Sequence, residues 1–385
     1  MFRAIKSLTL QNFLSFGPKP CRVDLEPINL LVGANGTGKS NLLEAFALLR
    51  EAPRDFSKVI RESATTVLDW LWQSGDSRAP AEASLKLEFE AGLVAANAAE
   101  YGLAFTARGP AFEVLDEWLK DEGEQGIGYY GIAQQVAVLQ TAGVHREVPW
   151  SLLSHHHSIL AQRHDPDTYP ELARLAHVLE QVRIYRSWAQ GPRSPLRAAC
   201  RSNEPAATLS EALDNLPIRL AVLKKSPQVK AKLLTHLREL APGFDDFEVT
   251  PEGGMLQLYL MEGRRQIPAG RLSDGTLRYL ALLAILLDPE PPPLLLIEEP
   301  ELALHPDVLP TLRDLMLEAS ERTQIIATTH SPSFLDAWSE RPEVVLICER
   351  DEEGTRLERL PPTSGPRTRS LGSRWMSGEL GGTRW

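Results

Sequence analysis

Scarce cysteine and short apolar runs set the first limits on this chain of 385 residues. The sequence has three cysteines, Cys21, Cys200 and Cys348, which lie far apart and form no CxxC pair. We interpret them as buried or reduced thiols of a cytoplasmic protein. The longest nearly uncharged apolar runs, 279–287 and 294–297, are far shorter than the ~20 residues that cross a bilayer, and the first residues lack the apolar core of a signal peptide. We therefore expect no membrane partner.

Excess positive charge and heptad repeats are also missing. The chain has 51 acidic residues against 41 lysines and arginines, which gives a formal net charge of −10. This balance argues against a surface built throughout to coat nucleic acid, although it leaves room for a local basic groove. No internal repeat and no long heptad run are present, which excludes an extended coiled-coil arm.

The apolar pattern predicts an α/β fold. Residues 3–16 have the pattern of a strand or hairpin, and a strand at 28–32 is followed by a glycine-rich turn and a helix at 41–50. We expect the chain to divide into a first lobe (1–150), a helical insert (151–271) and a second lobe (272–385). Further strands are expected at 84–90, 101–106, 132–139, 247–250, 255–261, 294–297, 324–328 and 344–348, and further helices at 170–182, 217–223, 226–240, 276–287 and 308–321.

The glycine-rich turn matches a phosphate-binding loop at every fixed position. Residues 33–40 spell GANGTGKS, which fits the pattern GxxxxGK[ST] between an apolar strand and a helix. Glycines let backbone N–H groups wrap closely around a triphosphate, and the helix that follows adds the positive end of its dipole. Lys39 is expected to reach the β- and γ-phosphates, and the Ser40 hydroxyl to bind Mg²⁺. The predicted ATP-binding residues are Gly33, Asn35, Gly36, Thr37, Gly38, Lys39, Ser40 and Asn41.

Two carboxylates end a buried strand further along the chain. Glu298 and Glu299 directly follow the apolar run 294–297, at the strand end where α/β sheets place their ligands. We expect Glu298 to face the metal and Glu299 to act as general base toward the attacking water. His330 follows the apolar strand residues 325–327 and is positioned to hydrogen-bond the γ-phosphate.

A short motif, LSDGT at 272–276, precedes a helix and lies upstream of the two carboxylates. Ser273 has two interpretations. It can cap the helix, or, together with the N–H of Gly275, it can form an anion site for the γ-phosphate held by another subunit.

These motifs together (INLLVGANGTGKSNLLEAF, LSDGT, IEEPELALHP and TTHS) resemble the RecF/SMC/OLD-like branch of ABC ATPases, and more narrowly the OLD-like AAA-21 group of bacterial ATPases. The resemblance covers nearly the whole chain. It implies a P-loop NTPase fold of the ABC or SMC-head type with a helical second lobe, ATP and Mg²⁺ as ligands, and residues 303–306 along a dimer seam. Glu298 stands where the wider ABC pattern has Asp, a choice common in this branch.

The resemblance also implies a homodimer closed around ATP. OLD-like proteins often continue into a Toprim nuclease domain, and too little chain follows His330 to hold one. We therefore expect an ATPase that regulates a separate effector, such as a nuclease, in DNA maintenance or phage defence. The alternative is a RecF-like clamp that binds DNA itself; a transporter's ATPase is the weakest possibility, because no transmembrane segment is present. The candidate DNA patch is the stretch 183–201, which has no acidic residue and contains Tyr185, Trp188 and five arginines: Arg183, Arg186, Arg193, Arg197 and Arg201.

Three smaller questions stay open in the sequence. The glutamine that would link the nucleotide to the helical lobe is Gln162, with Gln73 and Gln134 as alternatives. Phe16 is a core residue or a neighbour of the adenine. The run 155–157 of three histidines is interpreted as a solvated segment, because no carboxylate or cysteine completes a metal site.

Overall fold

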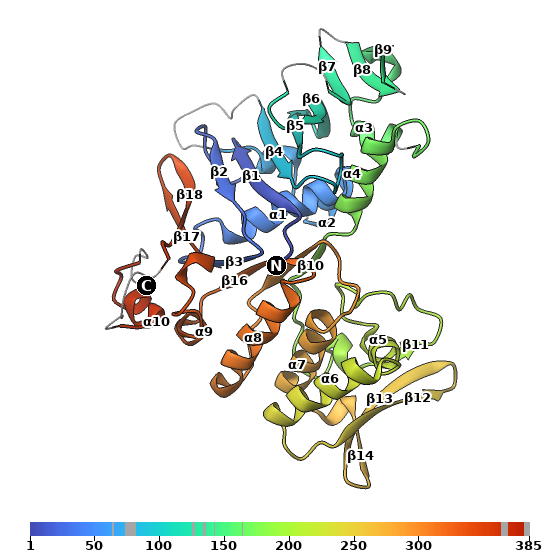
Figure 1. Cartoon of the computed structure of the whole chain (residues 1–385), viewed down its shortest axis with the longest axis vertical. Coiled ribbons are helices and arrows are strands. Elements are labelled where there is room, and N and C mark those ends of the chain that lie inside the picture. The colour runs from blue at the N-terminus through green and yellow to red at the C-terminus, as the bar shows by residue number, and fades with distance from the viewer. Residues whose placement is uncertain are drawn as a thin grey trace. The chain divides into compact units, whose positions relative to one another are not determined.

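The computed structural model of the chain divides into two compact units (Figure 1). Unit 1 comprises residues 1–2, 183–342 and 362–379, and unit 2 comprises residues 3–182, 343–361 and the chain from Leu380 onward. The structure describes residues 1–63, 65–73, 82–124, 128–133, 136–141, 143–163, 165–362 and 369–380. Within these residues, no helix is both long enough and apolar enough to span a bilayer.

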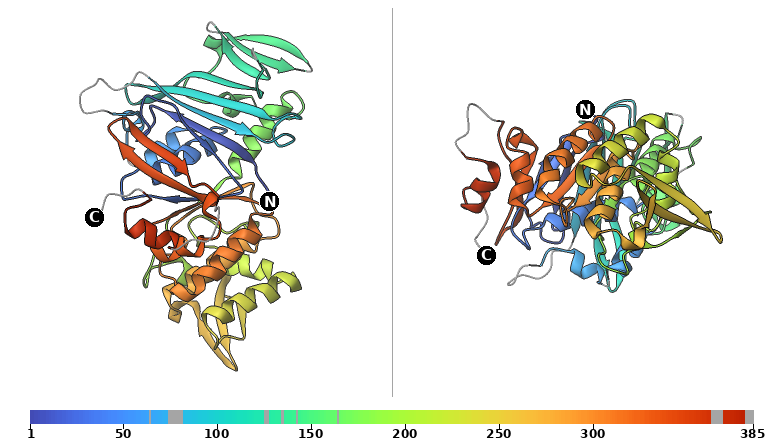
Figure 2. Two further views of the ribbon diagram at one scale, coloured as in Figure 1. Left: turned by 60° about the vertical axis from the view of Figure 1, so that its left-hand side comes forward. Right: turned by 90° about the horizontal axis from the view of Figure 1, so that it is seen from below.

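Unit 2 contains an eight-stranded antiparallel sheet, whose long middle strands are visible in Figure 2. Along β4, Leu85, Leu87 and Phe89 are buried and alternate with the half-exposed Ser84 and Lys86, so one face of the sheet covers a core. In spatial order the strands are β2 (Cys21–Asp24), β1 (Ile5–Gln11), β4 (Ala83–Phe89), β5 (Ala99–Arg108), β6 (Ala111–Asp121), β7 (Tyr130–Ala133), β8 (Val136–Thr141) and β9 (Val144–Pro149).

A second set of strands in unit 2 carries the glycine-rich loop. β3 (Ile28–Val32) is buried at all five positions and runs parallel to β17 (Val345–Asp351), which pairs antiparallel with β18 (Gly354–Arg359). The loop after β3 leads into α1 (Lys39–Arg50). The other helices of this unit are α2 (Ser57–Glu62), α3 (Ile159–Gln162) and α4 (Pro170–Glu180).

Unit 1 contains three parallel strands, β10 (Arg183–Tyr185), β15 (Leu294–Glu298) and β16 (Gln324–Thr329). The four apolar residues of β15 are buried, and burying a side chain of this size contributes about 1.5–3 kcal/mol. Parallel pairing sets Glu298 beside Thr328, so the carboxyl ends of β15 and β16 meet at one edge. The helices connected to these strands are α7 (Asp274–Leu286), α8 (Leu309–Ala319), α9 (Pro332–Ala337) and α10 (Leu371–Met376).

The rest of unit 1 is a small antiparallel sheet with two helices. Its strands are β11 (Cys200–Arg201), β13 (Met255–Glu262), β12 (Asp246–Glu252) and β14 (Arg265–Pro268). α5 (Leu216–Leu223) packs against β12, β13 and α7, and α6 (Pro227–Leu240) packs against α7. A buried ion pair joins Arg219 of α5 to Asp288, with 2.6 Å between Nη2 and Oδ2.

The predicted mixed α/β architecture is confirmed, with one correction in unit 2. Residues 132–139 do not form a single strand, because Ala133 and Val136 are antiparallel partners at the ends of β7 and β8. Apolar residues on both sides of this reversal made the run look continuous. Elements not predicted from the sequence are mostly short or polar: β2, β6, β9, β10, β11, β14, β18, α2, α3, α9 and α10.

Candidate functional site

The backbone of the glycine-rich loop in unit 2 favours glycine at two positions, and the surroundings of these two glycines differ. Gly36 and Gly38 have φ angles of 78° and 109°, in the left-handed region that side chains rarely adopt. A Cβ at Gly38 would also overlap the hydroxyls of Thr355 and Ser15, whereas a Cβ at Gly36 would meet nothing within 4 Å. The loop is thus packed against the protein at Gly38 and open at Gly36, the side from which a ligand could approach.

Side chains from three segments support the closed side of the loop. The Oγ1 of Thr355, on β18, lies 2.7 Å from both the Thr37 carbonyl oxygen and the Ser15 hydroxyl. Asn41 donates a hydrogen bond of 2.7 Å to the same Ser15 hydroxyl. The Cys348 thiol, on β17, donates to the Thr37 carbonyl at 3.3 Å. Burial raises the pKa of this thiol to about 11, so it packs as a neutral group.

Lys39 folds back over the loop. Its side chain is buried, and Nζ donates hydrogen bonds of 2.8 Å to the carbonyl oxygens of Gly33 and Ala34. Phosphate oxygens can take the place of these carbonyls as acceptors. The N-terminus of α1 has neither a side-chain cap nor an acidic residue in its first turn, so no carboxylate of that turn opposes an anion at the positive end of the helix dipole. Ser40 lies exposed in this first turn.

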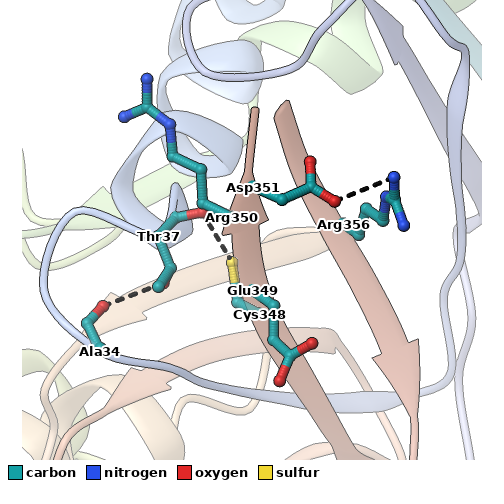
Figure 3. Close-up of a pocket in the computed structure, with 7 residues that line it drawn as sticks. All are labelled: Ala34, Thr37, Cys348, Glu349, Arg350, Asp351 and Arg356. Carbon is teal, nitrogen blue, oxygen red and sulfur yellow. Dashed lines mark hydrogen bonds and ion pairs between the residues drawn. The ribbon is translucent and has the colours of Figure 1, made fainter. Parts of the chain in front are cut away.

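A cavity of about 210 Å³ lies beside the loop in unit 2 (Figure 3). The carboxyl end of β17 supplies most of its lining, because parallel pairing with β3 brings Cys348 next to Gly33. Arg350 lies 5.9 Å from the Trp72 ring centroid. The lining residues are Ala34, Thr37, Cys348, Glu349, Arg350, Asp351 and Arg356, and the last two form an ion pair of 2.9 Å.

In unit 1, the predicted acids lie where β15 ends. Glu298 is the last residue of the strand, and Glu299 turns the chain with a φ of 47°, a left-handed conformation that is uncommon for glutamate. The Glu299 N–H donates to the Thr328 carbonyl at 3.1 Å. His330 follows β16, and its Nε2 lies 3.8 Å from Glu299 Oε1. The structure therefore brings Glu299 and His330 together.

Glu301 carries a third carboxyl group of this turn, close enough to Glu299 to feel its charge. It is buried and hydrogen-bonded to the Thr329 hydroxyl. Burial raises its pKa to about 7, with a smaller contribution from the charge of Glu299. The turn thus contains a neighbouring acid that holds its proton near neutral pH.

The LSDGT segment begins α7. The Ser273 hydroxyl accepts a hydrogen bond of 3.0 Å from the Thr276 N–H, so the capping interpretation of Ser273 is confirmed. A Cβ on Gly275 would lie 2.7 Å from the Ala303 carbonyl oxygen, which is why the helix start and the 299–304 turn can pack closely. Arg197 holds the segment from the other side: it donates to the Leu272 carbonyl at 2.6 Å and to Asp274 at 2.7 Å.

The contacts of Arg197 argue against the stretch 183–201 as a continuous basic patch. Its guanidinium also donates to the carbonyls of Gly191 and Gly270, so its hydrogen bonds are made to groups of unit 1. Tyr185 and Trp188 are buried and cannot offer a face to nucleic-acid bases. Arg193 and Arg201 are exposed.

The two candidate glutamines that the structure describes, Gln162 and Gln73, make hydrogen bonds within their own segments. The Gln162 amide hydrogen-bonds the backbone of Ser154 at 2.7 and 3.0 Å and thereby closes its own loop, while Gln73 donates to the Leu68 carbonyl at 3.1 Å. Gln134 lies outside the described residues. Phe16 is a core residue. Over the part of the chain that the structure describes, no three His, Cys, Asp or Glu side chains gather into a metal site, and this includes the histidines at 155–157.

Sequence reasoning did not find three residues that support these groups: Ser15, Thr355 and Arg278. Ser15 and Thr355 lie far from the loop in sequence and carry no signal of their own. Arg278 does carry one, because it is the single charged residue in the apolar helix segment 277–287. Its guanidinium donates to the Glu299 carbonyl.

Comparisons with known proteins agree on the family and the fold. Residues 28–144 and 207–336, more than half of the chain, match the model of the family described as "AAA domain, putative AbiEii toxin, Type IV TA system". None of the curated proteins matches the chain in sequence. An Smc head bound to the C-winged helix domain of ScpA has a TM-score of 0.61 at 14% identity, over 92% of this chain and 98% of that one.

Two further solved structures have the same fold. An Smc head with an extended coiled coil, bound to the C-terminal domain of ScpA from Pyrococcus furiosus, has a TM-score of 0.56 at 14% identity, over 97% of this chain and 98% of that one. An Smc head from Pyrococcus yayanosii has a TM-score of 0.53 at 13% identity, over 93% and 97%. The chain therefore belongs to the AAA-21 family and has the fold of an SMC head, a P-loop NTPase fold.

Proposed function

We propose that this protein binds ATP with Mg²⁺ at residues 33–41 and hydrolyses it between two copies of the chain. The observation that carries the proposal is the loop itself. Gly36 leaves one side open, α1 presents an uncapped N-terminus, and the Lys39 ammonium is held at the loop by carbonyls that a phosphate can replace. This arrangement suits a triphosphate better than a neutral ligand.

The donor chemistry fits a magnesium ion. Mg²⁺ prefers oxygen ligands and usually binds through one or two side chains together with phosphates and water. Ser40 offers a hydroxyl in the first turn of α1, and Glu298 offers a carboxylate at the end of β15. When bound, the ion would neutralise negative charge on the phosphates.

Glu299 and His330 are proposed to perform the chemistry. The Glu299 carboxylate accepts the proton of the attacking water, and His330 donates a hydrogen bond to the γ-phosphate. Their separation of 3.8 Å, from Nε2 to Oε1, supports a joint role around one reacting group. Lys39 stabilises the negative charge that builds on the leaving β-phosphate as its bond to the γ-phosphate breaks.

Ser273 and the Gly275 N–H are proposed to complete the site of a second copy, so the active form is a homodimer around two ATP molecules. The support is geometric. Ser273 and Gly275 lie at the N-terminus of the 13-residue helix α7, where anions bind well, and the acid of that turn, Asp274, is paired with Arg197 at 2.7 Å. Nucleotide would then govern association.

The dimer is proposed to act on a separate effector, such as a nuclease, in DNA maintenance or phage defence. Two Smc heads of the same fold are bound to domains of another protein, ScpA. That precedent favours a partner polypeptide. Direct DNA binding is the second candidate, supported only by exposed Arg193 and Arg201.

An ATPase assay of the purified chain tests the first step. We expect phosphate release that depends on Mg²⁺ and disappears in Lys39→Ala, with Lys225→Ala as an exposed lysine control that keeps turnover. Absence of release in the wild type, with ATP binding unaffected by Lys39→Ala, would contradict the proposal. Stimulation by DNA that Arg193→Glu with Arg201→Glu removes would favour the clamp, and a co-purifying polypeptide without any DNA effect would favour the effector subunit.

A further inference from the structure

Arg278 is an unusual residue for its position. It lies in α7, in a segment whose other residues from Leu277 to Leu287 are uncharged, and its side chain is buried at 2% exposure. Taking a guanidinium out of water is costly unless its hydrogen bonds and charge are matched. Burial lowers the pKa of Arg278 to about 10, against the effect of the Glu301 and Glu299 carboxylates nearby.

The contacts of Arg278 converge on the acidic turn. One Nη2 hydrogen bond goes to the Glu299 carbonyl oxygen. The guanidinium carbon lies 4.2 Å from the centroid of the Trp188 ring, within cation–π distance. Trp188 in turn donates a hydrogen bond of 2.8 Å from Nε1 to the Glu298 carbonyl. Arg278 and Trp188 thus hold the peptides of both acids.

The turn needs this support because its backbone is strained. Glu299 has a φ of 47°, and a non-glycine residue in this region stays there only when its surroundings hold it. The Glu299 N–H donates a hydrogen bond to the Thr328 carbonyl, and the Glu299 carbonyl accepts one from Arg278. Both backbone groups of Glu299 are therefore held in place. Rotation of this backbone would change the direction in which the Glu299 carboxylate points.

Stability alone does not account for an arginine here. Nε and Nη1 of Arg278 have no hydrogen-bond partner in the described part of the chain, so the buried charge is incompletely matched. A buried ion pair is often no better for stability than well-packed apolar side chains, and a partly matched charge is worse. A leucine or methionine would therefore fill this position at less cost.

We propose that Arg278 is a positioning residue for Glu299: it fixes the Glu299 peptide so that the carboxylate faces the water that attacks the γ-phosphate. Because Arg278 follows Ser273 and Gly275 on the same helix, it also ties the carboxylate to the segment expected to meet the second copy's nucleotide. The inference rests on the proposed function, in which Glu299 is the general base.

The test compares Arg278→Lys and Arg278→Met with Arg219→Met, which removes another buried arginine of unit 1, paired with Asp288 rather than with the acidic turn. Each variant is assayed for kcat, KM and ATP binding. Since misplacing a reacting group by about 1 Å can cost 100-fold, we expect kcat to fall roughly 100-fold in Arg278→Met and about tenfold in Arg278→Lys, with KM and ATP affinity near wild type. Arg219→Met should unfold at lower denaturant but keep its kcat.

A second comparison separates positioning from folding. In a Glu299→Gln background, adding Arg278→Lys should leave ATP binding and the ATP-dependent formation of a dimer intact. Arg278 is proposed to position the base, which this background already lacks, and not to bind ATP. Wild-type kcat in both Arg278 variants, with Glu299→Gln inactive, would overturn the inference and leave the proposed function standing. Equal kcat losses in Arg278→Met and Arg219→Met would also overturn it. An active Glu299→Gln would instead overturn the proposed function.

Discussion

The glycine-rich loop of unit 2 and the acidic turn of unit 1 hold their functional groups in position in different ways. In the loop, backbone geometry makes the site: two glycines with positive φ, a helix end and one lysine hydrogen-bonded to nearby carbonyls. In the acidic turn, the functional groups are side chains, and distant segments hold the backbone that carries them.

The difference has a physical origin. A phosphate needs many N–H donors close together, which a short glycine-rich segment supplies by itself. A general base needs one carboxylate in one direction, and a strained glutamate keeps that direction only with outside support. We therefore expect the loop to be sensitive to added atoms and the turn to be sensitive to lost contacts.

The largest expected effect is on chemistry in the acidic turn. Glu299→Gln should lower kcat by about 10²–10⁴-fold, because the amide cannot accept the proton of water. ATP binding should stay near wild type, since the loop lies outside the change, whereas Lys39→Ala should lose binding as well. Turnover and nucleotide binding are measured separately. Loss of binding in Glu299→Gln would break the comparison.

The next effect separates the two glycines of the loop. Gly38→Ala should cost about 3 kcal/mol or more of folding free energy or a matching loss of ATP affinity, because a left-handed alanine is strained and its Cβ overlaps the Thr355 and Ser15 hydroxyls. Gly36→Ala meets open space and should cost about 1–2 kcal/mol. Denaturant unfolding and ATP titration of both variants check the order. Equal costs would show that crowding at Gly38 is unimportant.

Sequence and structure agree where the determinants are local. Residues 33–40 were recognisable because the strand, the glycines and the helix follow one another, and β3 has the predicted bounds of 28–32. The apolar runs likewise predicted β15, β16 and α7, with only small differences at their ends. The three-part division at 150 and 271, and the roles of the site residues, stay predictions.

The rest of the site was out of reach because its supports come from elsewhere in the chain. Thr355 lies 340 positions from Ser15, and no periodicity in the sequence links the two. The stretch 183–201 had the pattern of a basic patch because composition does not show that Arg197 bonds to Asp274 or that Trp188 is buried. Arg278 alone could have been singled out, as a lone charge in an apolar helix.

Smaller effects are expected from two buried carboxyl groups, Glu117 in unit 2 and Glu301 in unit 1. Glu117 of β6 accepts hydrogen bonds from the Tyr101 hydroxyl at 2.7 Å and the Ile159 N–H at 2.8 Å, and burial raises its pKa to about 7 from an ordinary 4.5. A raised pKa means that the folded state favours the proton. Stability from this group is therefore complete below about pH 4.5 and is lost as pH rises through about 7, at up to about 1.4 kcal/mol per pH unit.

Glu117→Gln should remove that dependence, because an amide resembles the protonated acid and does not titrate. As pH rises from 5 to 8, we expect the free energy of unfolding of the variant to increase relative to that of the wild type, as measured by denaturant titration. Its kcat at pH 7 should be unchanged. Parallel stability curves for the two proteins would contradict the buried, raised-pKa carboxyl. Glu301 differs because it lies beside Glu299, so Glu301→Gln should change the pH profile of kcat.

The smallest effect concerns the exposed arginines. Arg193→Glu with Arg201→Glu should change stability by at most about 0.5 kcal/mol and leave basal turnover unchanged, because both side chains are exposed. Arg197→Glu should behave differently, because it removes the contacts to Leu272 and Asp274 that hold the start of α7. Equal effects of the two changes on turnover would show that Arg197 does not hold the segment.

The most direct test of the central claim is the molar mass of Glu299→Gln with and without Mg²⁺–ATP, measured by size exclusion with light scattering. The account predicts a mass of one chain without nucleotide and of two chains with ATP, with one ATP retained per chain, and a return to one chain when Ser273→Arg is added. A variant that stays a single chain in saturating ATP while turning over at the wild-type rate would contradict it.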